Sequence, residues 1–536
     1  MRSSCRVTVR MAVSLIVLGG AGVAVGAGPA AGKASKPPAY TLANVGAYGG
    51  EPSIAANSKG ELYDTTPSGG TILYRSTNHG ASWTQATTAD PSSGDDCVAT
   101  DQSGAIYECN LAGSQSTGPL QADVWKSLDD GRTWIYGENA IDVAGNVCGT
   151  SCSPFGVDRP WADAYVPAGG TTSTATVVLM YHDFFGPSQI WVNVSTDGGR
   201  TYGPPIDVLA NLTAQGANPG VVAQADSACN TVPAGARIEK TGPHPGRIYV
   251  AWIASDPESP ATGCNVTMVQ AFHNLFVAWS DDGGATWTPQ LAYDAGIGHD
   301  TSTPFVAFTL DNRGNPYFSF ATPAPGADPA TCAAESTAGT VQSDPTCAYH
   351  MWVAWSSDGG TTWDGGGGAF PGTAATAYEV DAAASAQTDV FPAIAAGNPG
   401  QVDVAWLHTN EIEPTDALGK FDPGGCAGPG PANGNPTYYP PTCSWNLYAG
   451  QSLDLSEPPG RAVWTTTQVT STPMHVGDIC NLGIFCVDPS SNRNLRDYIS
   501  ETVDPTTGFA HIAYADDNTV NKLRAANQVS GAGIGP

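Results

Sequence analysis

The chain has 536 residues, only 13% of them charged, and its 49 acidic residues outnumber its 21 lysines and arginines. The formal net charge of -28 repels phosphate backbones and anionic lipid headgroups, so we expect no binding to nucleic acid or to a membrane surface. The length allows either one large repeat-built domain or several ordinary domains.

The first 27 residues are typical of a secretory signal peptide. Arg2, Arg6 and Arg10 precede an apolar run, and a small-residue site follows at Val25–Ala27. An uncleaved membrane anchor is the alternative. We expect the mature protein to be secreted and extracellular, with no membrane contact after cleavage.

The cysteines agree with export. Removing Cys5 with the signal peptide leaves twelve of the 13, an even number that suits disulfides in an oxidising compartment. Their spacing predicts six local disulfides, Cys97 to Cys109, Cys148 to Cys152, Cys229 to Cys264, Cys332 to Cys347, Cys426 to Cys443 and Cys480 to Cys486. A zinc site is the alternative, although the spacings lack the paired Cys-x-x-Cys pattern of structural zinc.

An eight-residue pattern, Ser-x-Asp-x-Gly-x-Ser/Thr-Trp/Tyr, recurs along the chain. Copies begin at Ser76, Ser127, Ser195, Ser280 and Ser356, and a stretched sixth copy spans Ser452–Trp464. A short apolar or aromatic run precedes each copy, which is typical of a β-strand. Each octet therefore predicts a hairpin turn, in which the aspartate accepts backbone hydrogen bonds, glycine allows positive φ and the aromatic residue packs on the core.

A second repeated element, two strands joined by a turn, lies upstream of the octets. It begins at Glu51, Asp95, Asp158, Thr303, Phe391 and Arg496. In the fourth unit it is split between residues 218–229 and 244–253, on either side of an insertion.

Four antiparallel strands per unit, repeated around an axis, predict an all-β fold that is a single β-propeller. We expect seven blades, with six as the alternative, and Tyr40–Ala47 supplies the strand missing from the last blade. The propeller then occupies residues 40–528, after an N-terminal linker at 28–39 and before a C-terminal tail at 529–536.

The octets are similar to the Asp-box, or BNR, repeats of the sialidase superfamily, and the resemblance covers nearly the whole mature chain. It implies that the octets form the turns between third and fourth strands, on the face away from the ligand site. It therefore assigns scaffold roles to the octet aspartates and tryptophans, Asp129, Asp197, Asp282, Asp358, Trp83, Trp134, Trp287 and Trp363.

The same resemblance places the chemistry where the innermost strands begin. A sialidase grips a sugar carboxylate with three arginines and attacks with a tyrosine that a glutamate polarises, while an aspartate serves as acid and base. The residues that match these roles are Tyr498, Glu51 and Asp64 as catalytic groups and Arg159, Arg496 and Asp158 as substrate-binding groups. Gly50, however, stands where the first-blade arginine of the Arg-Ile-Pro signature belongs. Arg237, Arg247 and Arg313 are the remaining candidates for an arginine triad.

The segment from His475 to Tyr498 is the loop in which we expect further ligand contacts. His475 and Asp478 are candidates for binding a ligand or a metal ion, and Asp95 and Asp96 for binding calcium. We expect that no cofactor is required, and calcium is a candidate ion.

The sequence therefore predicts a secreted, sialidase-like Asp-box propeller that presents a polar central face to a glycan or protein ligand, with exo-α-sialidase-type hydrolase activity. The alternative is a propeller without hydrolase activity that serves in binding or in structural surface display. The missing first-blade arginine leaves the choice between enzyme and binding protein open.

Overall fold

We analysed a computed structural model of the chain. It describes residues 36–535 except 47–48, 69, 91–93, 113–120, 138–156, 184–189, 214–224, 226–230, 256–271, 297–298, 302, 304, 325–326, 329–347, 364–376, 382–387, 410–443, 457–461, 478, 480–492 and 519–521. No helix in these described ranges is both long enough and apolar enough to span a bilayer.

The first four blades in chain order are antiparallel sheets, each running from an inner to an outer strand. Blade 1 contains β2 (Ser53–Ala56), β3 (Leu62–Pro67), β4 (Thr71–Ser76) and β5 (Thr84–Gln85). Blade 2 contains β6 (Asp96–Thr100), β7 (Ile106–Ala112), β8 (Gln121–Ser127) and β9 (Ile135–Tyr136). Blade 3 contains β10 (Val157–Tyr165), β11 (Thr176–Asp183), β12 (Ile190–Ser195) and β13 (Ile206–Asp207), with short 3-10 helices η2 (Thr172–Thr174) and η3 (Leu209–Asn211). Blade 4 contains β14 (Thr231–Ile238), β15 (Ile248–Ser255), β16 (Phe272–Ser280) and β17 (Thr288–Asp294).

The remaining three blades follow the same plan. Blade 5 contains β18 (Ala307–Leu310), β19 (Pro316–Pro323), β20 (Tyr349–Trp355) and β21 (Tyr378–Glu379). Blade 6 contains β22 (Thr388–Ala396), β23 (Val402–Thr409), β24 (Ser444–Ser452) and β25 (Trp464–Gln468), and β26 (His475–Val476) also pairs with β24. Blade 7 contains β27 (Ser500–Val503), β28 (Ala510–Asp516), β29 (Lys522–Ser530) and β1 (Ala39–Gly46).

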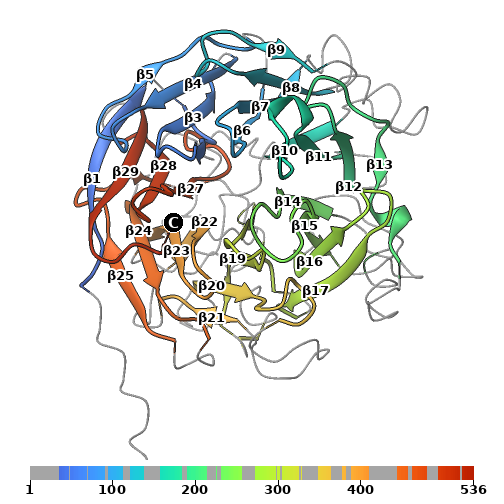
Figure 1. Ribbon diagram of the computed structural model, residues 1–536. Helices are drawn as coiled ribbons and strands as arrows, with labels where there is room; N and C mark the ends of the chain where they lie inside the picture. The colour runs from blue at the N-terminus through green and yellow to red at the C-terminus, as the bar shows by residue number, and fades with distance from the viewer. Residues whose placement is uncertain are drawn as a thin grey trace, which may run out of the picture. The chain divides into compact units, whose positions relative to one another are not determined.

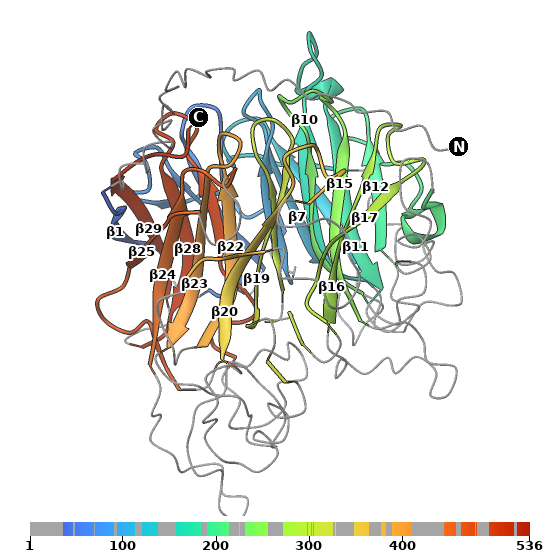
Figure 2. The same cartoon turned by 90° about the horizontal axis from the view of Figure 1, so that it is seen from below.

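The seven sheets form a propeller, which confirms the predicted fold class and blade number. Figure 1 shows the inner strands β6, β10, β14, β22 and β27 around the centre of the ring, and Figure 2 shows the blades from the side. The ring closes as predicted, because β1 from the start of the chain pairs antiparallel with β29 near its end and completes blade 7.

The strand directions separate two faces of the ring. Each inner strand begins at one end of the ring, here called the mouth, and antiparallel alternation returns the chain to the opposite end after the third strand. The octets lie at that opposite end, here called the octet face, between third and fourth strands. Ser280, for example, ends β16, and Thr288 begins β17 directly after the octet.

Inside each octet the side chains hold the turn. The Oγ of Ser280 donates to Asp282 Oδ1 at 2.7 Å, and the backbone N–H of Thr286 donates to the same oxygen at 2.9 Å. Gly284, at φ 96°, donates its N–H to Ser280 Oγ at 2.8 Å. Hydrogen bonds of the same kind form around Asp129, Asp197 and Asp358, and their oxygens are thereby occupied in the turn.

The hydrophobic core is divided among the contacts between neighbouring blades. One cluster joins Val178 and Met180 of blade 3 to Trp252, Phe276 and Trp287 of blade 4. The octet tryptophans differ in depth. Trp287 and Trp363 are buried, whereas Trp83 and Trp134 are half-buried and pack on smaller clusters.

Two sequence expectations can be compared with the described strands. Cys97 and Cys109 lie opposite each other on β6 and β7 and form the predicted disulfide, while the other five predicted pairs lie outside the described residues. In blade 4, the inner strand expected within residues 218–229 was wrong. The inner strand is β14 (Thr231–Ile238), which pairs with β15 and lies within the segment that was expected to be an insertion.

Candidate functional site

Four residues at the mouth share an unusual backbone conformation. Glu51, Arg159, Phe391 and Arg496 have φ of 52°, 53°, 56° and 60°, and each lies beside the start of an inner strand. Three of the four precede proline. Positive φ is costly for residues with a side chain and tends to persist where the surrounding structure imposes it, often at functional positions. The backbone thus marks the same ring of positions that the repeat pattern selected.

Position 50 has no room for the expected signature arginine. A Cβ atom at Gly50 would lie 2.7 Å from Arg496 Cγ and 2.7 Å from the backbone oxygen of Leu495. Arg496 of blade 7 therefore fills the space beside the first blade, and any side chain at position 50 would collide with it. The absence of the first-blade arginine follows from this packing.

Arg159 is the centre of a buried ion cluster. Its side chain is 2% exposed, and its Nη1 lies 3.1 Å from Asp95 Oδ2 and 3.7 Å from Glu51 Oε2. The second oxygen of Glu51 lies 3.8 Å from Arg493 Nη2, which also contacts Asp497 at 2.5 Å. Charged side chains thus meet around Arg159 from four blades, or from the segments that lead into them, namely blades 1, 2, 3 and 7.

Aromatic rings enclose the same guanidinium group. The Arg159 Cζ atom lies 4.1 Å from the ring centre of Tyr498, 5.3 Å from Trp161 and 5.2 Å from Phe305. Cation–π attraction of this kind strengthens when the cation is desolvated. We call the whole group the Arg159 cluster, and it consists of Glu51, Asp95, Arg159, Trp161, Phe305, Arg493, Arg496, Asp497 and Tyr498.

The pKa values of the two carboxyl groups that face Arg159 are shifted in opposite directions. Burial, and then the charges of Asp95 and Asp497, raise the pKa of Glu51 well above its usual range. Burial also opposes ionisation of Asp95, but Arg159 and the neighbouring arginines outweigh it and lower the pKa of Asp95. Burial thus favours the protonated form of Glu51, whereas the arginines favour the charged form of Asp95 that faces Arg159.

Tyr498 lies within the cluster as a buried phenol. Its hydroxyl donates to the backbone oxygen of Asp96 at 3.3 Å. Burial raises the pKa of Tyr498 well above 10, although Arg159 acts in the other direction. The phenol is therefore neutral at physiological pH, and its nearest hydrogen-bond partner is a carbonyl group.

The other predicted site residues lie in several places. Asp158 adjoins Arg159, and burial raises its pKa to about 8. Asp64 is fully buried on β3, opposite Ile54 of β2, and burial and Asp96 raise its pKa. His475 is buried in β26, with its Nδ1 2.7 Å from Asp517 Oδ1, which removes it from solvent. Asp478 lies outside the described residues.

Three further arginines were candidates for a triad, and none of them contacts the Arg159 cluster in the interactions described below. Arg247 forms a two-point ion pair with Asp281, the residue that follows β16 at the octet face. Arg313 lies in the turn between β18 and β19. Arg237 donates to the backbone oxygen of Ala236. The arginines that do converge are Arg159, Arg493 and Arg496, all of which act on the charge of Asp95.

A cavity of about 580 Å³ lies on the octet face, away from this cluster. Its lining includes Asp358, Asn315 and Glu239, and each of these holds a local turn through its own hydrogen bonds. At the mouth, by contrast, aromatic rings and charged side chains from several blades surround one guanidinium group, so we place the candidate site there.

Buried acids predict an unusual pH dependence of stability. Burial raises the pKa of Asp158 to about 8 and those of Asp123 and Asp403 to about 7. Their unfolded forms release the proton near pH 4, so the folded state is favoured at low pH and loses stability as pH rises toward 8. We expect the thermal unfolding midpoint to fall by several degrees between pH 5 and pH 8, measured at constant ionic strength.

Asp123→Asn is the matched variant for this pH dependence, because it keeps the shape and lies outside the Arg159 cluster. It should be more stable than the wild type at pH 8, and this difference should shrink as pH falls to 5 and toward 4. A wild-type midpoint that rises from pH 5 to pH 8 would contradict the assignment of protonated buried acids.

Comparisons with known proteins were made for the whole chain. Neither a known protein-family profile nor a curated protein sequence matches it. Among solved structures it is similar to a Hadza microbial sialidase, at a TM-score of 0.37 and 13% identity over 86% of this chain and 74% of that chain. It is also similar to the intramolecular trans-sialidase from Ruminococcus gnavus (0.35 and 11%, over 93% and 97%) and to a xyloglucanase from Xanthomonas campestris (0.40 and 14%, over 90% and 55%).

At these identities and TM-scores the similarities carry no weight in assigning a substrate or an activity. By its own strand pairing, the chain is a seven-bladed β-propeller.

Proposed function

We propose that the mouth of the propeller binds a glycan at the Arg159 cluster. Trp161 and Phe305 are half-buried there and lie beside the buried guanidinium group. Aromatic surface with a few convergent polar groups is typical of small-ligand sites. Asp95 and Arg493, which are 25% and 34% exposed, are the charged groups that an entering sugar can reach.

One observation carries this proposal. Arg159 Nε and Nη2 and Arg496 Nε are buried without a hydrogen-bond partner among the described residues. Buried polar atoms in folded proteins nearly always have a partner, so unsatisfied ones gathered at the mouth support a role in binding a polar ligand. A sugar hydroxyl or an ordered water that bridges to it can satisfy such atoms.

Sialidase-type hydrolysis is the second candidate, favoured by the chemistry of two residues. Tyr498 lies against Arg159 at the last blade, and Asp158 keeps its proton near pH 7, as a general acid must. It ranks second because Arg159 and Arg493 already pair with carboxylates of the chain itself, whereas a sialidase uses its arginines on the substrate. We also propose that the protein acts outside the cell, because residues 1–27 have the composition of a signal peptide.

The test combines binding with hydrolysis, using oxidised, secreted protein. Glycan-array binding followed by titration calorimetry should show saturable binding by the wild type and at least tenfold weaker binding by Trp161→Ala. Trp134→Ala is the matched control, because it removes a half-buried tryptophan at the octet face and should bind as the wild type does. Turnover of a fluorogenic α-sialoside is measured in parallel for the wild type and Tyr498→Phe.

Each outcome separates the candidates. Binding without turnover supports the glycan-binding propeller, and turnover that Tyr498→Phe abolishes supports the hydrolase. If the wild type shows neither, or if Trp161→Ala binds as tightly as Trp134→Ala, the mouth is not the binding site.

A further inference from the structure

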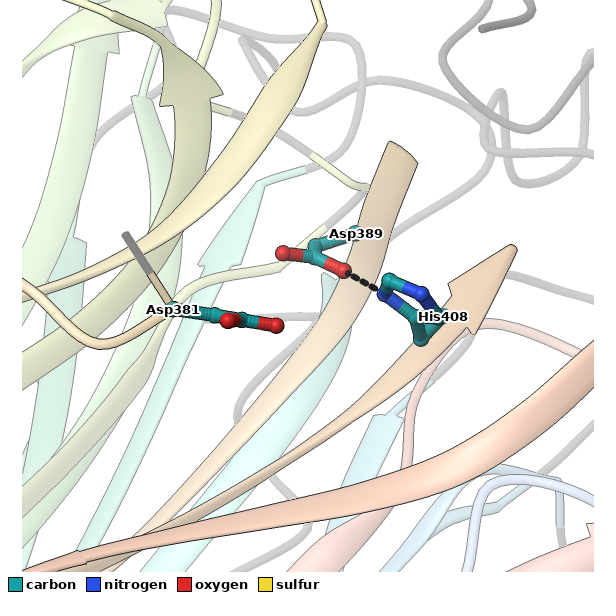
Figure 3. Close-up of side chains that lie close together, drawn as sticks. All are labelled: Asp381, Asp389 and His408. Carbon is teal, nitrogen blue, oxygen red and sulfur yellow. Dashed lines mark hydrogen bonds and ion pairs between the residues drawn. The ribbon is translucent and has the colours of Figure 1, made fainter. Parts of the chain in front are cut away.

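A second cluster of ionisable side chains lies between blades 5 and 6, apart from the Arg159 cluster. Asp381 follows β21, Asp389 is on β22 and His408 is on β23, and all three are buried. One ligand atom from each residue lies within 4.8 Å of the others, and no other group of this kind occurs in the part of the chain that the structure describes. Figure 3 shows the Asp381 carboxyl group extending toward Asp389 and His408.

The sheet register brings two of these side chains together. Asp389 and His408 are directly opposite on β22 and β23, and Asp389 Oδ1 lies 2.8 Å from His408 Nδ1 (Figure 3). The other oxygen, Asp389 Oδ2, is buried without a hydrogen-bond partner among the described residues, on a residue that is 0% exposed. A carboxylate oxygen in such a position is costly unless a partner satisfies it.

The surroundings add negative charge. Glu379 Oε1 lies 3.1 Å from His350 Nδ1, which brings a third carboxyl group and a second imidazole close to the cluster. The ring of Tyr448 lies 4.3 Å from that of His408 and covers it. Three carboxyl groups and two imidazoles thus occupy a largely buried space, and buried charges in proteins are usually paired or bound to a metal ion.

The spacing of the ligand atoms suits a single ion. Metal–ligand distances are about 2.0–2.2 Å for imidazole nitrogen and carboxylate oxygen, so two ligands at a right angle lie about 3 Å apart and opposed ligands about 4 Å apart. The separations within the Asp381, Asp389 and His408 group fall in this range or just beyond it, so small side-chain rotations suffice.

We propose that Asp381, Asp389 and His408 bind a divalent transition-metal ion such as Zn²⁺, which ties blade 5 to blade 6. The imidazole distinguishes this set from a calcium or magnesium site, since those ions prefer oxygen ligands alone. The ion supplies the missing partner of Asp389 Oδ2 and offsets the charge of the two aspartates. This site differs in place and chemistry from the calcium candidate at Asp95 and Asp96, of which Asp95 forms an ion pair with Arg159.

The experiment uses untagged full-length protein stripped of metal with a chelator. Titration with Zn²⁺, followed by calorimetry and elemental analysis after dialysis, should give one bound ion per chain and a higher thermal midpoint. Asp389→Asn and Asp381→Asn should each weaken binding at least tenfold, and Asp381→Asn leaves the hydrogen bond between Asp389 and His408 in place. Parallel titrations with Ca²⁺ and Mg²⁺ should show much weaker binding.

His273→Gln is the matched control. It breaks a similar histidine–aspartate contact, 2.7 Å between His273 Nδ1 and Asp294 Oδ1 in blade 4, and should retain the bound ion. The proposal is overturned if the wild type takes up no Zn²⁺, or if folded Asp389→Asn and Asp381→Asn, checked by circular dichroism, bind it as the wild type does. The titration of the wild type tests the proposal even if the variants fail to fold.

Discussion

Trp287→Ala is expected to lower the free energy of unfolding by about 3–5 kcal/mol, the usual range for a fully buried tryptophan. Trp287 is 0% exposed and packs in the core between blades 3 and 4. Its indole N–H donates to the Gly284 oxygen at 2.9 Å, and its backbone pairs with Asn211 and Thr213 from blade 3. The substitution therefore opens a cavity at a junction between blades, and equilibrium denaturation in urea measures the loss.

Trp134→Ala provides the comparison at the equivalent octet position of blade 2. Trp134 is only half-buried, so less apolar surface is lost and the cost should be less than half of that for Trp287→Ala. If the two variants lose equal stability, the octet tryptophan stabilises its own turn and not the packing between blades.

The propeller could be predicted because its signals are local and repeated. In each octet the serine, aspartate and glycine that hold the turn lie within five positions, so their spacing is visible in the sequence, as in Ser280, Asp282 and Gly284. The closing strand β1 could also be predicted, since blade 7 otherwise lacked a partner for β29. Blade 4 was misjudged because β14 lies between residues 229 and 244, a segment that carries no recognisable copy of the repeat and was expected to be an insertion.

The site could be predicted only in part. Arg159, Glu51 and Arg496 were recognisable because they occupy the repeated position at the start of inner strands, where the backbone has positive φ. Arg493 and Asp497 were missed, and Asp95 was assigned to calcium. Arg493 faces Glu51 at the start of the first blade, and Asp95 faces Arg159 of the next blade, and these contacts follow no period in the sequence. The closely spaced arginines 493 and 496 before the last inner strand were the one available signal.

The cluster of Asp381, Asp389 and His408 has no sequence signature for a similar reason. Asp389 and His408 meet only because β22 and β23 pair in a register that places them opposite each other. Asp381 joins them from the outer edge of the preceding blade, across a boundary that the repeat does not encode. Contacts between blades therefore determine both clusters, while the repeat determines the blades.

Arg159→Met is expected to lower the free energy of unfolding at pH 8 by about 3–5 kcal/mol, because it leaves buried carboxyl groups without their cation. Methionine retains much of the apolar contact with Tyr498 and Trp161, so the effect isolates the charge. Burial raises the pKa of Asp95, and Arg159 is the main group that lowers it. Without Arg159, Asp95 should therefore be harder to ionise in the folded state. A group with a raised folded pKa destabilises the protein as pH rises, so the loss should be smaller at pH 5 than at pH 8.

Arg247→Met is the control for Arg159→Met, because Arg247 also lies over two aromatic rings, Tyr249 and Trp279, and forms an ion pair. Its partner Asp281 is 58% exposed, so water replaces the lost cation and the cost should be about 1 kcal/mol or less, with little dependence on pH. Denaturation of both variants at pH 5 and pH 8 gives the comparison. Equal losses for the two, or a loss for Arg159→Met that shrinks as pH rises, would mean that Arg159 acts through packing and that the acids at the mouth do not depend on its charge.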